Sequence, residues 1–233
     1  MELELSTIDG PMPAVLVEPS FTPRGAILVI QEAFGLNDHI RSIAERIAEA
    51  GYVAIAPALF HRLGSPTAPY DDFAAVIPAI SSLTEESITT DIDAALQELA
   101  RRGFAPSSIG IVGFCMGGAI ALHTATRGLV GAAVTFYGGG VTTGRFGLPS
   151  LVELAPHLRA PWLGLYGDLD GSIPVDQVEQ LRQESAKASV PTQIVRYEHA
   201  GHGFNCDVRA DYEPESAQDA WARCLSWFEV SLS

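Results

Sequence analysis

Short apolar runs alternate along the chain with segments in which apolar residues recur at helical spacing. The runs predict strands, and several are almost wholly apolar, as strands buried on both faces of a sheet must be. The predicted strands are Ala14–Val17, Ala26–Ile30, Val53–Ala56, Ile109–Val112, Ala132–Phe136, Trp162–Tyr166 and Gln193–Tyr197. The opening residues favour an antiparallel hairpin at the sheet edge. We therefore expect a mostly parallel central sheet.

Helical spacing of apolar residues predicts helices between and after these strands. The clearest such segments are residues 40–48, 88–99 and 215–230. The first two stop at Gly51 and Gly103, which suit a left-handed C-cap. Ser82 and Glu85 form a candidate capping box for the second helix, and Pro174 suits the first turn of another.

The alternation of strand and helix with short connections predicts a doubly wound α/β fold with helices on both faces of the sheet. A chain of 233 residues can form one such domain, and we expect a single domain over residues 1–233. In this architecture ligands bind at the carboxyl ends of the strands. Residues 60–84 and 138–150 show little regular pattern, and we expect them to overhang a site there.

The net charge of the chain excludes some classes of binding partner. The formal net charge is −14 and the isoelectric point about 4.7, so the surface repels phosphate backbones and anionic lipids. We expect no nucleic-acid partner. Because neither a secretory signal pattern nor a run of about 18 apolar residues is present, we predict a soluble, cytoplasmic protein without a membrane partner.

The cysteines and histidines give no sign of a disulfide framework or a metal site. Cys115, Cys206 and Cys224 are odd in number and form no CxxC pair, which favours free thiols. His199 and His202 come nearest to metal-ligand spacing, but no further ligand set stands beside them. We therefore expect neither metal nor organic cofactor.

Residues 113–118, GFCMGG, directly follow a predicted buried strand. They could form a tight turn in which Cys115 is simply a small buried residue. A dinucleotide-binding loop is disfavoured, because Cys115 stands where that loop needs its second glycine. The G-x-C-x-G pattern also matches a nucleophile elbow, in which the N-terminus of the next helix favours the thiolate. The amide of Met116 would then be an oxyanion donor.

Acidic and basic candidates follow the elbow in the order nucleophile, acid, base, which is typical of α/β-hydrolases. Asp168 and Asp170 follow one predicted strand, and His199 and His202 follow the last one. Each could instead be a turn, capping or solvated loop residue. Three such loops at strand ends, in this order, favour a catalytic triad with Cys115.

These residues and their surroundings resemble the dienelactone hydrolase family, carboxymethylenebutenolidase-like enzymes of the α/β-hydrolase fold with a Cys-Asp-His triad. The resemblance covers nearly the whole chain. The segments that carry it are AILVIQEAFGLNDHIRSIAERIAEAGYVAIAPALFHR, IGIVGFCMGGAIAL, FYGGG, APHLRAPWLGLYGDLDGSIP and YEHAGHGFN.

The resemblance assigns the triad residue by residue. The family pattern G-x-x-D-x-x-[VI]-P selects Asp170 over Asp168, and AGH-x-F makes His202, rather than His199, the base.

The resemblance also gives roles to two residues after the strand that ends at Ile30. Taken alone, Glu32 could be a solvated carboxylate at a loop end. By similarity it interacts with the Cys115 thiol at rest and helps to deprotonate it when substrate arrives. The amide of Ala33 would be the second oxyanion donor beside that of Met116.

The expected reaction is acyl transfer from an ester or lactone to Cys115, followed by hydrolysis. A thiolate leaves a tetrahedral intermediate more readily than an alkoxide, so cysteine favours esters with good leaving groups. The resemblance implies hydrolysis of dienelactone to maleylacetate. A broader carboxylesterase or thioesterase and a non-catalytic binding protein are the alternatives. We expect a small-molecule substrate and a monomer or small homo-oligomer.

The chain departs from the family at the residues that bind the substrate carboxylate. The family has an arginine four residues after the catalytic histidine, where this chain has Cys206, and residues 63–86 lack the second arginine. Arg62 and Arg145 are candidate substitutes, although either could be a surface charge. Aromatic residues that could line an apolar pocket or pack in the core are Phe34, Phe60, Tyr137, Trp162 and Phe204.

Overall fold

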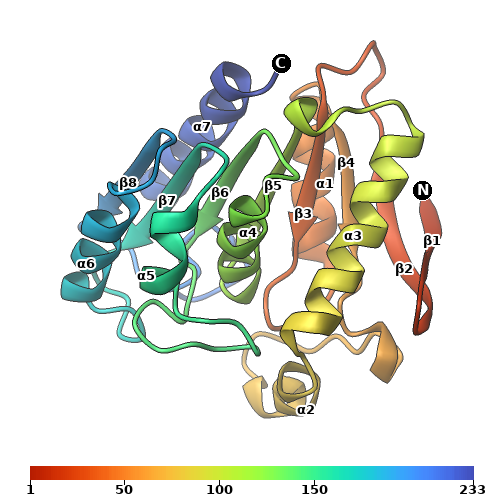
Figure 1. The fold of residues 1–233 in the computed structure, drawn as a ribbon. Coiled ribbons are helices and arrows are strands. Elements are labelled where there is room, and N and C mark those ends of the chain that lie inside the picture. The colour runs from red at the N-terminus through yellow and green to blue at the C-terminus, as the bar shows by residue number, and fades with distance from the viewer.

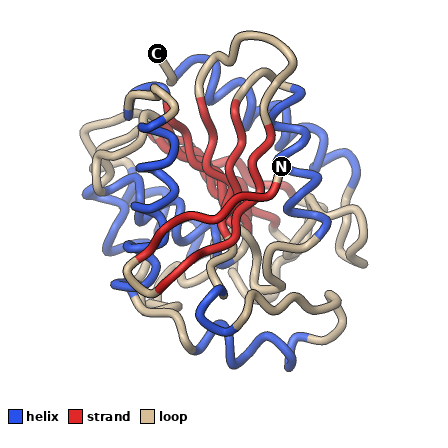
Figure 2. The backbone as a smooth tube through the Cα atoms, turned by 90° about the vertical axis from the view of Figure 1, so that its right-hand side faces the viewer, coloured by secondary structure: helices blue, strands red, loops and turns tan.

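The structure, a computed structural model, describes residues 1–233 and contains one eight-stranded sheet (Figures 1 and 2). The strands are β1 (Glu2–Thr7), β2 (Gly10–Val17), β3 (Ala26–Ile30), β4 (Val53–Pro57), β5 (Ile109–Phe114), β6 (Ala132–Phe136), β7 (Trp162–Gly167) and β8 (Thr192–Tyr197). Their order across the sheet is β1-β2-β4-β3-β5-β6-β7-β8. β1 and β2 form the predicted hairpin, β2 pairs antiparallel with β4, and all other pairs are parallel.

Helices cover both faces of this sheet, as predicted (Figure 1). They are α1 (Asp38–Glu49), α2 (Ile77–Ser81), α3 (Glu85–Arg101), α4 (Met116–Thr126), α5 (Leu151–Leu154), α6 (Val175–Ser185) and α7 (Pro214–Ser231). Short 3-10 turns are η1 (His61–Leu63), η2 (Phe73–Val76), η3 (Pro106–Ser108) and η4 (Ala155–His157). One core cluster of 41 buried residues joins α3, α4 and α6 to one face, and a second of 27 joins α1 and α7 to the other. Burial of these apolar side chains is the main force holding the layers together.

The ends of the helices follow the sequence closely, with one correction. Gly51 and Gly103 have φ angles of +96° and +95°, the predicted left-handed conformation. The capping box of α3, however, is formed by Thr84 and Ser87, each side chain accepting a hydrogen bond from the other's backbone amide. Ser82 is instead the C-cap of α2, a short helix that the sequence pattern did not predict and that delays the start of α3.

The parallel strands bring distant loops to one edge of the sheet. β3, β5, β7 and β8 run in the same direction, so the loops after their carboxyl ends lie together. Those loops carry Glu32, Cys115, Asp170 and His202. No helix is both long enough and apolar enough to cross a membrane. A single domain over residues 1–233 stays a prediction, although every strand belongs to this one sheet.

Candidate active site

Cys115 occupies a strained turn between β5 and α4. Its φ and ψ angles are +53° and −112°, a conformation that a residue with a side chain rarely adopts. The turn needs its glycines: a Cβ on Gly113 would lie 1.8 Å from the carbonyl oxygen of Gly117, and one on Gly117 would lie 2.5 Å from that of Ile30. The backbone therefore has the geometry of a nucleophile elbow, with the Cys115 side chain projecting into a cavity.

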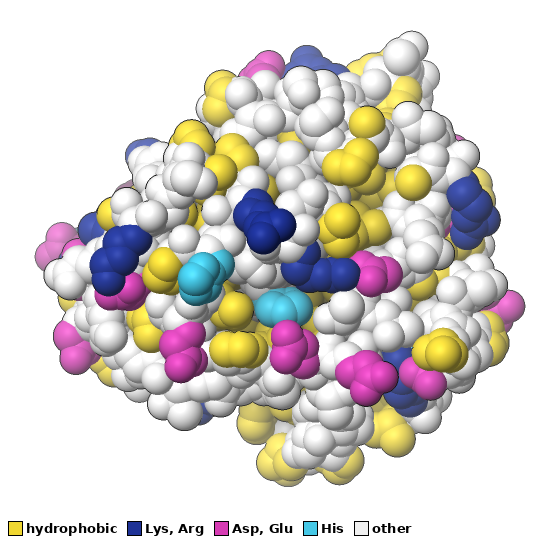
Figure 3. Space-filling view, in the orientation of Figure 1, with side chains coloured by type: hydrophobic (Ala, Val, Ile, Leu, Met, Phe, Trp, Pro, Cys, Tyr) yellow, Lys and Arg dark blue, Asp and Glu magenta, His cyan; other side chains and the backbone are white.

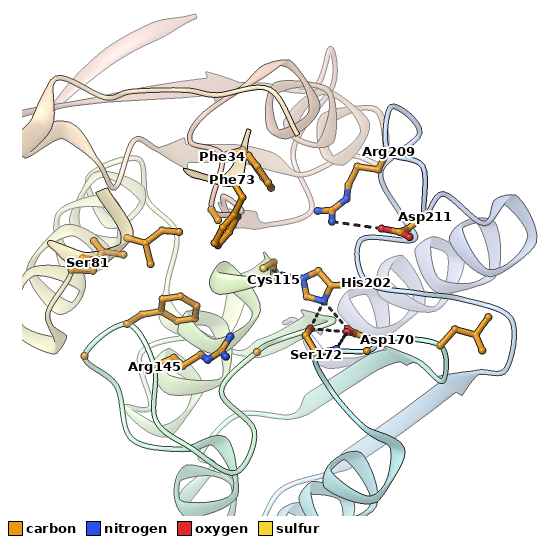
Figure 4. A pocket seen from close by; sticks show the side chains of 18 residues that line it. Phe34, Phe73, Ser81, Cys115, Arg145, Asp170, Ser172, His202, Arg209 and Asp211 are labelled. Atoms are coloured by element: carbon orange, nitrogen blue, oxygen red, sulfur yellow. Dashed lines mark hydrogen bonds and ion pairs between the residues drawn. The ribbon is translucent and has the colours of Figure 1, made fainter. Parts of the chain in front are cut away.

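Cys115, His202 and Asp170 are joined by hydrogen bonds (Figure 4). His202 Nε2 lies 3.1 Å from Cys115 Sγ, and His202 Nδ1 lies 2.6 Å from Asp170 Oδ2. The other oxygen of Asp170 accepts hydrogen bonds from the Ser172 amide at 2.8 Å and the Ser172 hydroxyl at 2.7 Å. The Asp170 carboxylate is thus fixed on one side by Ser172 and orients the imidazole with the other.

These contacts set the charges of the site. Burial alone would lower the pKa of His202, but the negative charge of Cys115 and hydrogen bonds to Asp170 and Cys115 raise that pKa from 6.5 to about 10. Burial would raise the pKa of Asp170, yet hydrogen bonds from His202 and Ser172 hold it below its usual value. The contacts with Asp170 and Cys115 therefore favour the imidazolium form of His202, which the buried Asp170 carboxylate holds in place.

The two alternative triad residues lie elsewhere. Asp168 forms a two-pronged ion pair with Arg196, with both nitrogen–oxygen distances at 2.7 Å. His199 is exposed to solvent. Asp170, not Asp168, is therefore the carboxylate that contacts His202.

The two expected oxyanion donors are free to bind a ligand. The amide of Met116 opens α4 and has no acceptor within the helix, and the amide of Ala33 donates to no backbone acceptor. Ala33 and Cys115 line the same cavity.

Glu32 is fully buried behind this cavity, rather than solvated at a loop end. Neither of its carboxylate oxygens has a hydrogen-bond partner. No hydrogen bond joins Glu32 to Cys115, and its nearest cation is Arg209, whose Nη1 lies 3.8 Å from Glu32 Oε1. The resting contact that the resemblance implies is thus replaced by a contact with an arginine.

Arg209 is the functional candidate that sequence reasoning missed. Its side chain is 15% exposed, and its guanidinium carbon lies 5.8 Å from the Phe34 ring and 5.3 Å from the Tyr70 ring. A turn after His202 returns the chain to the cavity and so places Arg209 in its wall. In this turn the Arg209 amide donates a hydrogen bond of 3.1 Å to the Cys206 carbonyl. The only sequence signal is a single basic residue seven positions after His202, where no family motif places one.

The cavity above Cys115 has a volume of about 800 Å³ (Figure 4). The two segments without regular pattern do overhang it: one supplies Phe73, Ile80, Ser81 and Leu83, and the other supplies Gly139, Arg145, Phe146 and Gly147. Phe34 and Arg209 line a further part of the wall. Apolar and aromatic groups therefore surround a reactive centre with two arginines within reach.

Three of the predicted substrate-binding residues do not line this cavity. Arg62 is held by a two-pronged ion pair with buried Asp91 and a second pair with Asp9. Tyr137 and Phe204 are fully buried, with ring centroids 5.4 Å apart. The Tyr137 and His202 ring centroids lie 5.2 Å apart, so Tyr137 packs against the imidazole from within the core. Phe34 and Arg145 are the two predicted residues that do reach the cavity.

The surface around the site carries charges of both signs. Arg145 and Arg209 line the cavity together with Asp170 and Asp211. Figure 3 shows basic, acidic and histidine side chains interspersed across the middle of the face seen in Figure 1. Despite the net charge of −14, an anionic substrate can therefore meet cationic groups locally.

A doubly wound sheet with a nucleophile elbow, and with an acid and a histidine on the following strand-end loops, defines the α/β-hydrolase class. The model of the dienelactone hydrolase family matches residues 12–232. The chain belongs to this family, and is a hydrolytic enzyme that acts on esters.

Individual relatives agree with this placement. A protein of Escherichia coli O157:H7, provisionally named as a carboxymethylenebutenolidase, is 40% identical over 94% of this chain and 82% of its own length. The carboxymethylenebutenolidase of Pseudomonas putida is 29% identical over 97% of this chain and 94% of its own length. A crystal structure from Klebsiella pneumoniae, provisionally described as a dienelactone hydrolase, is 37% identical with a TM-score of 0.89, covering 98% of this chain and 97% of that one.

Proposed function

We propose that this enzyme hydrolyses activated carboxylic esters or enol lactones through a covalent thioacyl intermediate on Cys115. The observation that carries the proposal is the line of contacts from Cys115 Sγ through His202 to Asp170, at 3.1 Å and 2.6 Å. Nucleophile and base lie within hydrogen-bonding reach, and the base is held by a third group, as covalent catalysis requires.

The reaction would proceed in two halves. Cys115 Sγ attacks the carbonyl carbon, and the amides of Met116 and Ala33 stabilise the resulting oxyanion. The C–O bond to the leaving group breaks, and His202 supplies the proton if that group needs one. His202 then removes a proton from water, which attacks the thioester and releases the acid and the thiol. Asp170 holds the imidazole orientation throughout.

The chemistry of sulfur restricts the leaving group. The tetrahedral intermediate expels whichever group has the lower pKa, and a thiolate leaves more readily than a simple alkoxide. Enolates and phenolates compete with the thiolate, so enol lactones and aryl esters are the expected substrates. The dienelactone named in the family description is one such enol lactone.

Arg209 is placed to make the substrate-carboxylate contact for which the sequence offers no family arginine. Its guanidinium lines the cavity, is mostly buried, and lies 3.8 Å from Glu32 without a hydrogen bond to it. A planar guanidinium matches a carboxylate through two parallel hydrogen bonds. Arg145 is the second cation of the cavity. We infer that the preferred substrate carries a carboxylate near its scissile ester.

A broader carboxylesterase is the second candidate, and the size of the cavity favours it. A volume of about 800 Å³ with aromatic walls exceeds what a small monocyclic lactone fills. Aryl esters with larger acyl groups would therefore also fit.

The test compares cis- and trans-dienelactone with p-nitrophenyl acetate in steady state, with Cys115→Ala as the blank. Faster turnover of a dienelactone that disappears in Cys115→Ala supports the first function, and aryl-ester cleavage alone supports the second. Trapping the acetylated enzyme by rapid quench and mass spectrometry checks the intermediate. Unchanged hydrolysis in Cys115→Ala would refute the cysteine mechanism.

A further inference from the structure

Three side chains with metal-ligand chemistry meet behind the catalytic cavity. One carboxylate oxygen of Glu32, one ring nitrogen of His39 and the sulfur of Cys206 all lie within 4.8 Å of one another. Glu32 follows β3, His39 lies in the first turn of α1, and Cys206 lies in the loop after β8. All three residues are buried, Glu32 and Cys206 completely. Their separation along the chain explains why no sequence motif announces them.

Three polar atoms of this cluster have no hydrogen-bond partner within the protein, although Glu32 faces Arg209 at 3.8 Å and the Cys206 sulfur is in hydrogen-bonding contact with Tyr70. Both oxygens of Glu32 and the Nε2 atom of His39 are buried without a hydrogen bond. Leaving a buried polar group without a partner is energetically unfavourable, and native proteins contain few such groups. Three such atoms converging beside a buried thiol indicate that the set interacts with something besides its own neighbours.

We propose that Glu32, His39 and Cys206 form a zinc-binding site. Carboxylate oxygen, imidazole nitrogen and thiolate sulfur are the three donor types that zinc takes in proteins, and three protein ligands plus one water complete a tetrahedron. Zinc–ligand bonds of about 2.0–2.3 Å place ligand atoms roughly 3.5 Å apart, so atoms that lie within 4.8 Å of one another need to approach by at most about 1.3 Å. Rotation of the Glu32 side chain, which no hydrogen bond restrains, can supply much of this.

A separate cavity reaches His39, one of the three proposed ligands. It has a volume of about 460 Å³ and is lined by His39, Asn205 and Asp207, among others. Asp207 adds negative charge to this cavity, whereas Arg46, on the same wall, opposes a cation. It is distinct from the cavity that contains Cys115, whose lining does not include His39.

Binding at this site would inhibit hydrolysis, a consequence that rests on the proposed function. Arg209 lies 3.8 Å from Glu32 and competes with the metal for the same carboxylate. A zinc ion that takes Glu32 would neutralise this carboxylate in the neighbourhood of Cys115 and leave Arg209 paired only with Asp211, 3.8 Å away. Metal binding itself does not depend on catalysis and can be measured separately.

Cobalt(II) is a suitable probe, because a cobalt–thiolate bond gives a charge-transfer absorption band in the near ultraviolet. The wild-type protein should show this band, saturating at one equivalent, and zinc should displace it. His39→Gln and Cys206→Ser should weaken cobalt binding by at least about tenfold, since each removes one of three ligands. Cys224→Ser is the matched control: Cys224 is also fully buried but lies outside the cluster, and the band should persist.

The catalytic pair must be tested as the competing site, since Cys115 and His202 could themselves hold a metal. Cys115→Ala should therefore keep the band although it loses hydrolysis. Loss of the band in Cys115→Ala with retention in Cys206→Ser would overturn the proposal, as would no band in the wild type. If Cys206→Ser fails to fold by circular dichroism, His39→Gln decides alone. Retained cobalt binding in an inactive Cys115→Ala protein separates this inference from the proposed function.

Discussion

Replacing Arg209 by methionine tests whether this side chain binds a substrate carboxylate. The guanidinium is 15% exposed and lines the cavity of Cys115, so its hydrogen bonds to a ligand would be shielded from water. A hydrogen bond to a charged group contributes about 1.5–3 kcal/mol. At about 1.4 kcal/mol per tenfold change, kcat/KM should fall by roughly 10- to 140-fold for an aryl ester with a carboxylate on its acyl group.

The uncharged ester of the same size is the internal reference for this prediction. Its kcat/KM should fall by less than about threefold in Arg209→Met, because it loses no ion pair. Arg209→Lys should recover part of the lost rate for the carboxylated ester, since the charge returns but the planar fork does not. Arg145→Gln is the matched control within the same cavity, and shows how much a second cation contributes.

One outcome would refute this reasoning. Equal losses for the carboxylated and the uncharged ester would mean that Arg209 acts through Glu32 or through its packing on Phe34, rather than on the substrate. Melting temperatures of all variants must be measured beside the rates, because Arg209→Met leaves Glu32 buried without a cation.

Two further predictions concern the triad. Asp170→Asn should reduce kcat by about 10²- to 10⁴-fold in ester-hydrolysis assays, because the imidazole loses its orienting acceptor; Asp168→Asn should change kcat little while lowering the melting temperature. The pKa of His202 is raised to about 10 from 6.5 in the folded state, so the imidazolium stabilises the fold fully below pH 6.5 and this contribution is lost as pH rises towards 10. The melting temperature should thus fall as the pH rises over that window, and it should fall less steeply in Cys115→Ala. The same pH dependence of the melting temperature in both proteins would contradict the ion pair.

The sheet and the elbow could be predicted because they depend on local patterns. Apolar runs mark buried strands wherever they occur, and all seven predicted strands are present in the structure within a few residues. The elbow needs glycine at positions 113 and 117 for steric reasons that the sequence shows directly. Strand order then carried the acid and base to the same edge, as the α/β-hydrolase pattern predicts.

The substrate-binding residues could not be predicted in the same way, because their contacts depend on loops. Arg62 follows a strand and is basic, yet buried Asp91 on α3 holds it away from the cavity. Arg209 lies outside every motif, and only the turn after His202 brings it to Glu32. Short helix α2 was missed for a related reason, since five residues are too few for helical spacing to show.

A last prediction concerns moving the cavity arginine from position 209 to position 206. Cys206 stands where the family resemblance implies an arginine, and Arg209 lines the cavity from three residues further along. Cys206 is completely buried, so Cys206→Arg alone should destabilise the fold by crowding and by like charge. Adding Arg209→Ala makes room for the new side chain and removes the like charge, so it should relieve this destabilisation.

The double variant should therefore recover the preference for the carboxylated ester that Arg209→Ala alone loses, with a melting temperature above that of Cys206→Arg. It should also lose the cobalt band, because the thiol ligand is gone. If the double variant folds but still prefers the uncharged ester, the guanidinium must reach the cavity from position 209 specifically, and exchange between the two positions is wrong. Recovery of the preference without the cobalt band would instead show that an arginine at either position can bind the substrate carboxylate, and that only Cys206 binds the metal.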